Sequence, residues 1–179
     1  MIESLIYPKA LKWQAIRVNI VTRIWIRIAL ETKIKGGKNM KKILVTTDGS
    51  KYSQKALFKA RQMASDMGCE VTILSVVNLW DNVYSHNMDI KEQLGKTEMD
   101  RTQEILREAE EIFKGFEGEW KTVYKVGDVV DVIVSFAEEG NYDLVIMGSR
   151  GLGAFSRTLL GSVSDKVIHH IKTSVMIVK

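Results

Sequence analysis

The sequence has very little cysteine: Cys69 is the one cysteine among 179 residues. A single cysteine excludes a disulfide framework within the chain and a cysteine-based zinc site, and it agrees with a reducing compartment. The sequence therefore predicts a cytoplasmic protein. Because Cys69 lies where a strand is expected to begin, we predict a small buried hydrophobic residue and not a nucleophile.

Long hydrophobic runs are also missing. In the apolar stretch from Ile16 to Leu30, three arginines (Arg17, Arg23 and Arg27) interrupt every possible run of about 18 apolar residues, which excludes a membrane-spanning helix there. The pattern of a secretory signal is missing as well. Two interpretations of residues 1–39 remain: an amphipathic basic helix lying on an anionic membrane, or sequence outside the natural protein.

The second interpretation draws support from the segment Gly36-Gly37-Lys38-Asn39-Met40. Its codons can read GGA GGN AAR AAY ATG, a purine-rich ribosome-binding stretch at a suitable distance before a start codon. We therefore expect translation to begin at Met40. Residues 1–39 are then an N-terminal extension, mis-assigned or dispensable, before one domain at residues 40–179.

The positive charge of the chain is confined to this extension. The whole chain carries +4, and residues 1–39 hold eight basic and two acidic residues, so +4 minus +6 leaves −2 for residues 40–179. This mild acidity removes the compositional argument for a DNA or RNA binder. We expect no nucleic-acid partner, and no membrane partner unless the extension is real.

From Met40 onward, short apolar runs alternate with longer segments of helical periodicity, which is typical of βαβ units and a mostly parallel sheet. The expected strands are 43–47, 71–77, 120–126, 144–147 and 175–178, and the expected helices are 56–67, 99–113, 129–137 and 163–171. Polar and apolar residues alternate in 120–126, which predicts an edge strand. The fold class is α/β: a Rossmann-like open five-stranded parallel sheet with helices on both faces.

Several residues are expected to end elements. Gly68 is the expected left-handed end of the first helix, and the helix at 129–137 is expected to have Asp128 as its N-cap and to stop at Gly140. The segment from Asn78 to about Gly95 is polar and irregular and is long enough for a functional loop.

The ends of the strands are where such a sheet binds ligands, at the point where the strand order reverses. Asp48 ends the first strand, Val76 and Val77 end the second, and the fourth opens into the loop Gly148-Ser149-Arg150-Gly151-Leu152-Gly153. Glycines at such a place can adopt positive φ and bring their N–H groups against phosphate oxygens.

Ser162 lies where the last helix starts, and two roles stay open for it. Its hydroxyl can donate to a phosphate, or it can cap the helix, because Ser162-Val163-Ser164-Asp165 fits a capping-box frame. The Walker A ending Gly-Lys-Ser/Thr is missing, which argues against P-loop hydrolysis chemistry. The glycines from Gly148 to Gly153 follow the fourth strand, not the first, so we reject a dinucleotide fingerprint.

The glycine pattern resembles the ATP-binding signature of the universal stress protein family: Gly148, two residues, Gly151, nine residues, then Gly161-Ser162. Residues 41–50 resemble the opening strand of that family, and residues 142–151 resemble its fourth strand and loop. The resemblance covers Met40 to Lys179. One departure is Lys172-Thr173-Ser174, which replaces a usual proline-containing entry into the last strand.

The resemblance implies a site for ATP. The adenine would lie near Asp48 and the main chain of Val76, and the triphosphate would lie along the glycine loop and Ser162, with Mg²⁺ or Mn²⁺ on the phosphates. Family members are commonly homodimers joined through the last strand, here Val175 to Val178. The expected cofactor-binding residues are Thr46, Asp48, Ser50, Val76, Met147, Gly148, Arg150, Gly151, Gly161, Ser162, Val163 and Ser164.

The function implied is that of an ATP-binding stress-response protein, acting as a nucleotide-dependent binding or signalling module. The alternative is a slow ATP hydrolase or a nucleotidyl-transfer enzyme. Hydrolysis needs a group that positions water and charge that stabilises the γ-phosphate. The sequence places no obvious base or Walker-type lysine beside the glycine loop, so we favour binding and assign no catalytic residue and no protein ligand to a metal.

Other polar residues carry two interpretations each. Arg150 and Arg157 could contact phosphate or be solvated, and Asp48 could instead cap the first helix. His169 and His170 lie near the end of the last helix, where a histidine satisfies exposed carbonyls. His86 is expected to be solvent-exposed in the long loop.

Overall fold

The structure, a computed structural model, describes residues 40–78, 88–153 and 160–179. These residues form a five-stranded parallel sheet with the strand order β3-β2-β1-β4-β5. The strands are β1 (Lys42–Thr46), β2 (Glu70–Val77), β3 (Trp120–Val126), β4 (Leu144–Gly148) and β5 (Ser174–Val178). The order reverses between β1 and β4, because the chain builds β2 and β3 on one side of β1 and then crosses to the other. The predicted fold class is confirmed.

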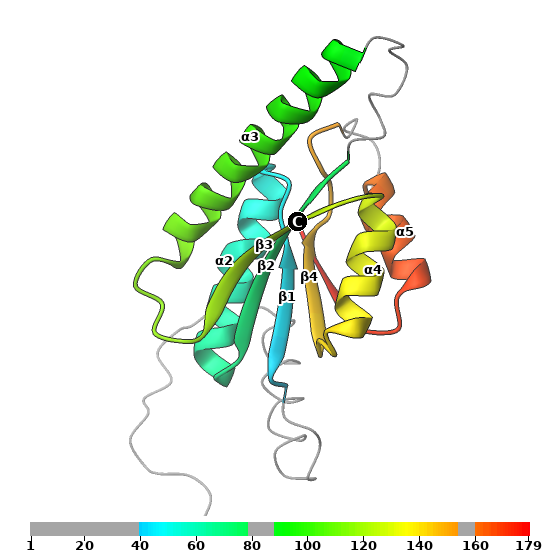
Figure 1. The fold of residues 1–179 in the computed structure, drawn as a ribbon. Helices are drawn as coiled ribbons and strands as arrows, with labels where there is room; N and C mark the ends of the chain where they lie inside the picture. The colour runs from blue at the N-terminus through cyan, green and yellow to red at the C-terminus, as the bar shows by residue number, and fades with distance from the viewer. Residues whose placement is uncertain (1–39, 79–87, 154–159) are drawn as a thin grey trace, which may run out of the picture. The chain divides into compact units, whose positions relative to one another are not determined.

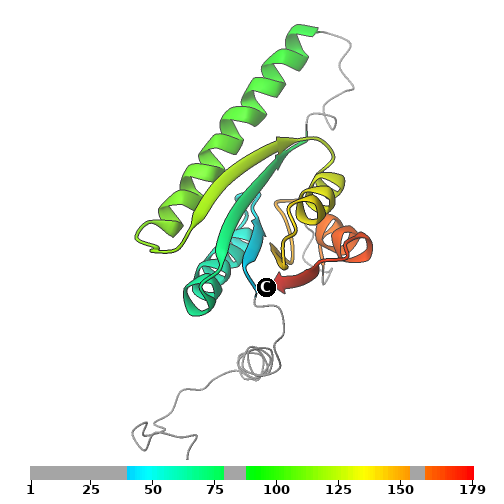
Figure 2. The same cartoon turned by 60° about the horizontal axis from the view of Figure 1, so that its bottom comes forward.

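Among the described residues, two helices cover each face of the sheet (Figures 1 and 2). The helices α2 (Lys51–Met67) and α3 (Met88–Phe113) pack on one face, and α4 (Val129–Glu139) and α5 (Ser162–His170) pack on the other. Successive side chains of β1 point to opposite faces of the sheet and so belong to different cores. Ile43 and Val45 pack in the core under α2 and α3, and Leu44 packs in the core under α4 and α5.

The start of α3 differs from the sequence prediction. The helix begins at Met88, so residues 88–95, predicted as loop, are helical, and Gly95 lies inside the helix. Apolar periodicity marks only the half of α3 that contacts the sheet, where Leu106, Ala109 and Phe113 are buried. The N-terminal half extends past the sheet (Figure 1), and residues 92–100 are not buried, so no apolar periodicity is imposed on them. The rest of the expected loop, with His86, lies outside the described residues.

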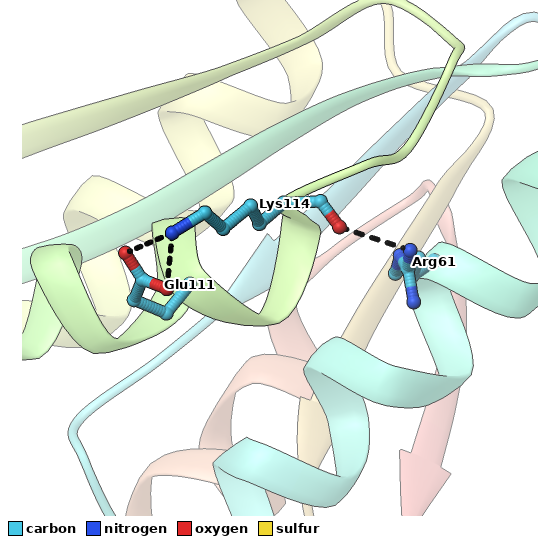
Figure 3. A network of polar contacts seen from close by, with 3 residues as sticks. All are labelled: Arg61, Glu111 and Lys114. Carbon is cyan, nitrogen blue, oxygen red and sulfur yellow. Dashed lines mark hydrogen bonds and ion pairs between the residues drawn. The ribbon is translucent and has the colours of Figure 1, made fainter.

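The C-terminal end of α3 is fixed to α2 by a polar contact (Figure 3). Arg61 of α2 donates from Nη2 to the main-chain oxygen of Lys114 at 3.2 Å. The side chain of Lys114 turns back to Glu111, with its Nζ 3.2 Å from Oε2. This contact connects the two helices that cover one face of the sheet.

The expected helix ends are confirmed at three positions. Gly68 is left-handed with φ of 68°, and Asp128 caps α4 by accepting from Val130 N and Asp131 N at 2.9 and 3.1 Å. Gly140 is the C-cap of α4, but with φ of −76°, and the left-handed position falls at Asn141 with φ of 51°. Within the described part of the chain, no helix has the length and apolar character needed to cross a membrane.

The two edge strands of the sheet are β3 and β5. β3 is only partly buried, as its alternating sequence predicts, and Tyr124 and Val126 are exposed. In β5 the four apolar residues from Val175 to Val178 are all half-buried. An apolar edge strand that keeps half of its surface open can pair with another strand.

Candidate nucleotide site

A cavity of about 700 Å³ opens at the carboxyl ends of β1, β2 and β4, where the strand order reverses. Its size lies in the range of small-molecule sites, which is roughly 300 to 1,000 Å³. The walls come from the end of β1, the end of β2, the loop after β4, and the N-terminal parts of α4 and α5.

The end of β1 contributes Asp48, held by a turn. Asp48 Oδ1 accepts from Ser50 N at 3.0 Å, while a Cβ placed on Gly151 would lie 2.6 Å from Oδ2. One carboxylate oxygen is therefore bound within the turn, and the other lies against the glycine loop. The N-cap of α2 is Ser50, whose Oγ accepts from Ser53 N at 3.2 Å, so the alternative of Asp48 as the helix cap is wrong.

The end of β2 turns main-chain groups toward the cavity. β1 ends its pairing at Thr46, opposite Leu74, and Thr47 N donates to Leu74 O at 2.9 Å. Because the peptide groups of a strand alternate in direction, Val76 presents its N–H and C=O on the same side as Leu74, beyond the end of β1. Val76 lines the cavity, so this donor and acceptor face the space.

The glycine loop after β4 is joined to α5 through Ser149, which is buried. Ser149 O accepts from Gly161 N at 2.8 Å and from Ser164 Oγ at 3.1 Å, and Ser149 N donates to Val178 O at 2.7 Å. These bonds bring the two halves of the glycine pattern together across the residues that separate them in the sequence.

The glycines of this loop provide space, not left-handed backbone. Gly148, Gly151 and Gly161 all lack positive φ, so the expectation of positive φ is wrong at these positions. A Cβ on Gly148 would lie 2.8 Å from Ser53 N, and one on Gly161 would lie 3.2 Å from the Cα of Arg150. The missing side chains allow backbone segments to meet closely beside the cavity.

The N-terminus of α5 supplies unpaired donors to the cavity. Helical bonding begins with Asp165 N, which donates to Gly161 O at 3.0 Å, so the N–H groups of Ser162, Val163 and Ser164 have no acceptor within the helix. All three residues line the cavity. The N-cap is Gly161, without a side-chain cap, so the capping-box interpretation of Ser162 is wrong. Such a helix end favours a bound anion.

The structure brings all but one of the twelve expected site residues to the cavity. Eleven line the cavity, and Ser50 lies behind its wall, where it caps α2 and donates from Oγ to Arg150 O at 3.3 Å. The sequence analysis missed an apolar wall made by Leu74, Val129 and Ile133. Further lining residues were not among the expected cofactor-binding residues: Thr47, Ser53, Leu152, Gly153, Leu160 and Asp165.

The formal charges on the described lining are few. Asp48 and Asp165 carry negative charge and Arg150 carries positive charge. Within the described ranges, no group of three or more histidine, cysteine, aspartate or glutamate residues could hold a metal ion. Arg157 and the rest of residues 154–159 lie outside the described residues.

Known proteins resemble this chain in sequence and in fold. The universal stress protein family model matches residues 39–179. A universal stress protein from Methanocaldococcus jannaschii is 31% identical over 151 residues, which covers 84% of this chain and 89% of that protein. One from Bacillus subtilis is 33% identical over 149 residues, covering 77% and 98%.

Solved structures of universal stress proteins have the same fold as this chain. UspA from Lactobacillus plantarum superposes with a TM-score of 0.71 at 22% identity, covering 80% of this chain and all of that one. A universal stress protein solved in complex with cAMP gives a TM-score of 0.57 at 29% identity, covering 79% of this chain and 98% of that one. Sequence, fold and glycine pattern agree, and the chain belongs to the universal stress protein family.

Proposed function

We propose that this chain binds ATP in the cavity at the switch point and acts in the cytoplasm as a nucleotide-dependent signalling module of the stress response. One observation carries the proposal. A single cavity combines unpaired main-chain donors at the start of α5 with a main-chain donor and acceptor at Val76. The first group suits phosphate and the second suits the edge of a base.

The adenine would occupy the side of the cavity near β2. Leu74, Ile133 and Met147 give apolar surface there for a flat ring. The main chain of Val76 and the carboxylate of Asp48 offer hydrogen-bond partners to the ring or the ribose. A site of this kind, mostly apolar with a few placed polar groups, is typical of small-molecule recognition.

The phosphates would occupy the side near the glycine loop and α5. The N–H groups of Ser162, Val163 and Ser164 supply donors, and the helix dipole adds positive potential. Because Asp48 and Asp165 offset the charge of Arg150, the described lining leaves most of the triphosphate charge uncompensated. Mg²⁺ or Mn²⁺ on the phosphates would supply that compensation, with at most these two carboxylates from the described lining.

The adenine class is supported by the relative solved with cAMP, which is 29% identical to this chain. ATP is the narrower part of the proposal. It rests on the phosphate side of the cavity, where donors continue from the glycine loop into the first turn of α5.

Binding is favoured over hydrolysis by the described lining. It contains no lysine, and its ionisable side chains are Asp48, Arg150 and Asp165. Phosphoryl transfer to water needs a placed water and concentrated positive charge at the γ-phosphate. We therefore propose a module that holds the nucleotide and presents its bound state to partners.

The proposed assembly is a homodimer through β5. Ser149 N bonds to Val178 O, so the peptide groups of Ser174, Met176 and Val178 face β4. Those of Val175 and Ile177 face away from the sheet, and their side chains are half-buried. A second copy of the strand could use these groups.

The direct test is to identify the nucleotide that the purified protein carries. Denaturation of the full chain should release an adenine nucleotide, identified by mass and counted per chain. Release of no nucleotide, together with no binding of added ATP, ADP or AMP in calorimetry, would refute the proposal. Release of a guanine or pyrimidine nucleotide would refute the adenine assignment.

A further inference from the structure

A cluster of positive charge surrounds the ring of Tyr52 in the first turn of α2. Lys51 Nζ lies 5.2 Å and Lys55 Nζ lies 5.7 Å from the ring centroid. Arg150, from the loop after β4, has its guanidinium carbon 5.6 Å from the same centroid and donates from Nη1 to Tyr52 Oη at 3.2 Å. We call these four residues the Tyr52 cluster.

The two lysines contradict the local preferences of a helix. Lys51 is the first residue of α2, where the helix dipole disfavours a cation, and the first turn contains no acidic residue. Lys55 lies four residues further on, a spacing that places like charges side by side. Lys51 takes part in none of the ion pairs of the described residues, and Lys55 Nζ donates to the main-chain oxygen of Lys179 at 3.3 Å. Departures from local preference of this kind are expected at functional sites.

Arg150 connects the Tyr52 cluster to the cavity. It lines the cavity, and its main-chain oxygen accepts from Ser50 Oγ at 3.3 Å. The backbone of α2 is equally close, because a Cβ placed on Gly148 would lie 2.8 Å from the carbonyl carbon of Tyr52. The cluster therefore adjoins the wall that is proposed to hold the phosphates.

We propose that the Tyr52 cluster is an anion subsite for phosphate groups beyond a triphosphate. The ligand class is a polyphosphate chain longer than that of ATP, carried by adenosine or free in solution. The position of the triphosphate rests on the proposed function.

Phosphate is the ligand that the chemistry of the cluster fits. Lysine binds phosphate as a point charge, and the guanidinium of arginine can donate two parallel hydrogen bonds to it. Asp48 and Asp165 offset positive charge in the described lining of the cavity. The Tyr52 cluster, in contrast, contains three positively charged side chains. Added negative charge is better placed at the cluster than deeper inside.

The test compares ligands that differ by one phosphate. The full chain and its Lys51→Gln/Lys55→Gln variant are titrated with ATP, adenosine 5′-tetraphosphate and inorganic tetraphosphate. The unmodified chain should bind the adenosine tetraphosphate about three- to tenfold more tightly than ATP, the gain expected from two exposed ion pairs. The variant should lose this preference and keep its affinity for ATP within about twofold.

Lys59→Gln is the matched control, because Lys59 lies on the same helix but contacts Gln62, with its Nζ 3.3 Å from Oε1. This variant should keep the preference. An equal affinity of the unmodified chain for ATP and the adenosine tetraphosphate would overturn the subsite, and so would a preference that survives in the double variant. Melting curves check folding, and removal of cations from a helix start should not destabilise α2.

Failure of the subsite can be told apart from failure of the proposed function. If ATP binds and the added phosphate gains nothing, the subsite is refuted and the ATP site stands. If ATP fails to bind but inorganic tetraphosphate binds through Lys51 and Lys55, the ATP site is refuted and the subsite stands, with free polyphosphate as its ligand.

Discussion

At the scale of single residues, the glycines of the loop after β4 differ in what a side chain would meet. A Cβ on Gly148 would collide with backbone, because Ser53 N would lie 2.8 Å away. A Cβ on Gly151 would collide with a carboxylate, because Asp48 Oδ2 would lie 2.6 Å away. Backbone within a packed helix cannot move aside, whereas the Asp48 side chain can rotate. The two glycines therefore have different roles, although the sequence pattern treats them alike.

Two substitutions separate these roles. Gly148→Ala should lower the free energy of unfolding by about 1–3 kcal/mol, as overpacking does. Gly151→Ala should change it by less than about 0.5 kcal/mol but weaken ATP binding about tenfold, because the displaced Asp48 carboxylate no longer meets the ligand. Urea unfolding and calorimetric titration measure the two effects. Equal losses of stability in both variants would contradict this division.

Cys69 illustrates a residue protected by the fold. Its side chain is 2% exposed, and Sγ lies 3.3 Å from Met40 O. Burial raises the pKa of the Cys69 thiol above its ordinary value, and the negative charge of Asp143 raises that pKa further. The native protein therefore holds less of the reactive thiolate at any pH than the unfolded chain does.

We predict that a maleimide labels the native protein slowly at pH 7 to 8 and labels it rapidly in denaturant. The sequence contains one cysteine, so the modified mass reports this residue alone. Labelling at the same rate in both conditions would show that Cys69 is accessible, against the burial described above.

At the scale of elements, the cap of α2 also holds the glycine loop. Ser50 caps the helix through Ser53 N and donates to Arg150 O in the loop. Asp128 caps α4 through Val130 N and Asp131 N, and its hydrogen bonds within the described residues stay at that helix. Asp128 is therefore a control for Ser50, because both residues cap a helix but only Ser50 also bonds to the glycine loop.

Ser50→Ala and Asp128→Ala should each lower the free energy of unfolding by about 1 kcal/mol, which is the usual cost of losing an N-cap. Only Ser50→Ala should also weaken ATP binding, because only that cap positions Arg150. Thermal unfolding and ATP titration of both variants measure this. Equal affinities for ATP in the two variants would show that the bond to the loop has no effect on the site.

The elements that could be predicted from the sequence are those whose pattern is imposed by the core. Four strands, β1, β2, β4 and β5, carry runs of apolar residues because both faces of the sheet are covered, and the alternation in β3 marks it as an edge strand. The strand ends locate the cavity. The first half of α3 could not be found, because residues 92–100 are not buried and no core imposes an apolar pattern on them. The wall formed by Val129 and Ile133 was also missed, because the placement of α4 over the ends of the strands depends on packing between distant segments.

At the scale of the whole molecule, the proposed dimer rests on one edge of the sheet. Ile177 directs its N–H away from β4, so proline at this position removes a donor that only a partner strand would use. Ile177→Pro should therefore weaken the dimer and leave the bonds between β4 and β5 in place. Sedimentation equilibrium of both chains measures the association. An unmodified chain that stays monomeric would refute the dimer, and an equally tight dimer of the variant would place the interface elsewhere.

The central claim is that the cavity at the switch point binds ATP, and the melting temperature of the full chain with and without Mg²⁺-ATP tests it most directly. A ligand that binds only the folded state must stabilise it. At about one hundred times the dissociation constant, ATP should raise the melting temperature of the unmodified chain by about 5–10 °C. It should not raise that of Gly151→Val, whose side chain would fill the space beside Asp48. An unchanged melting temperature of the unmodified chain at millimolar ATP, or an equal rise in the variant, would contradict the account.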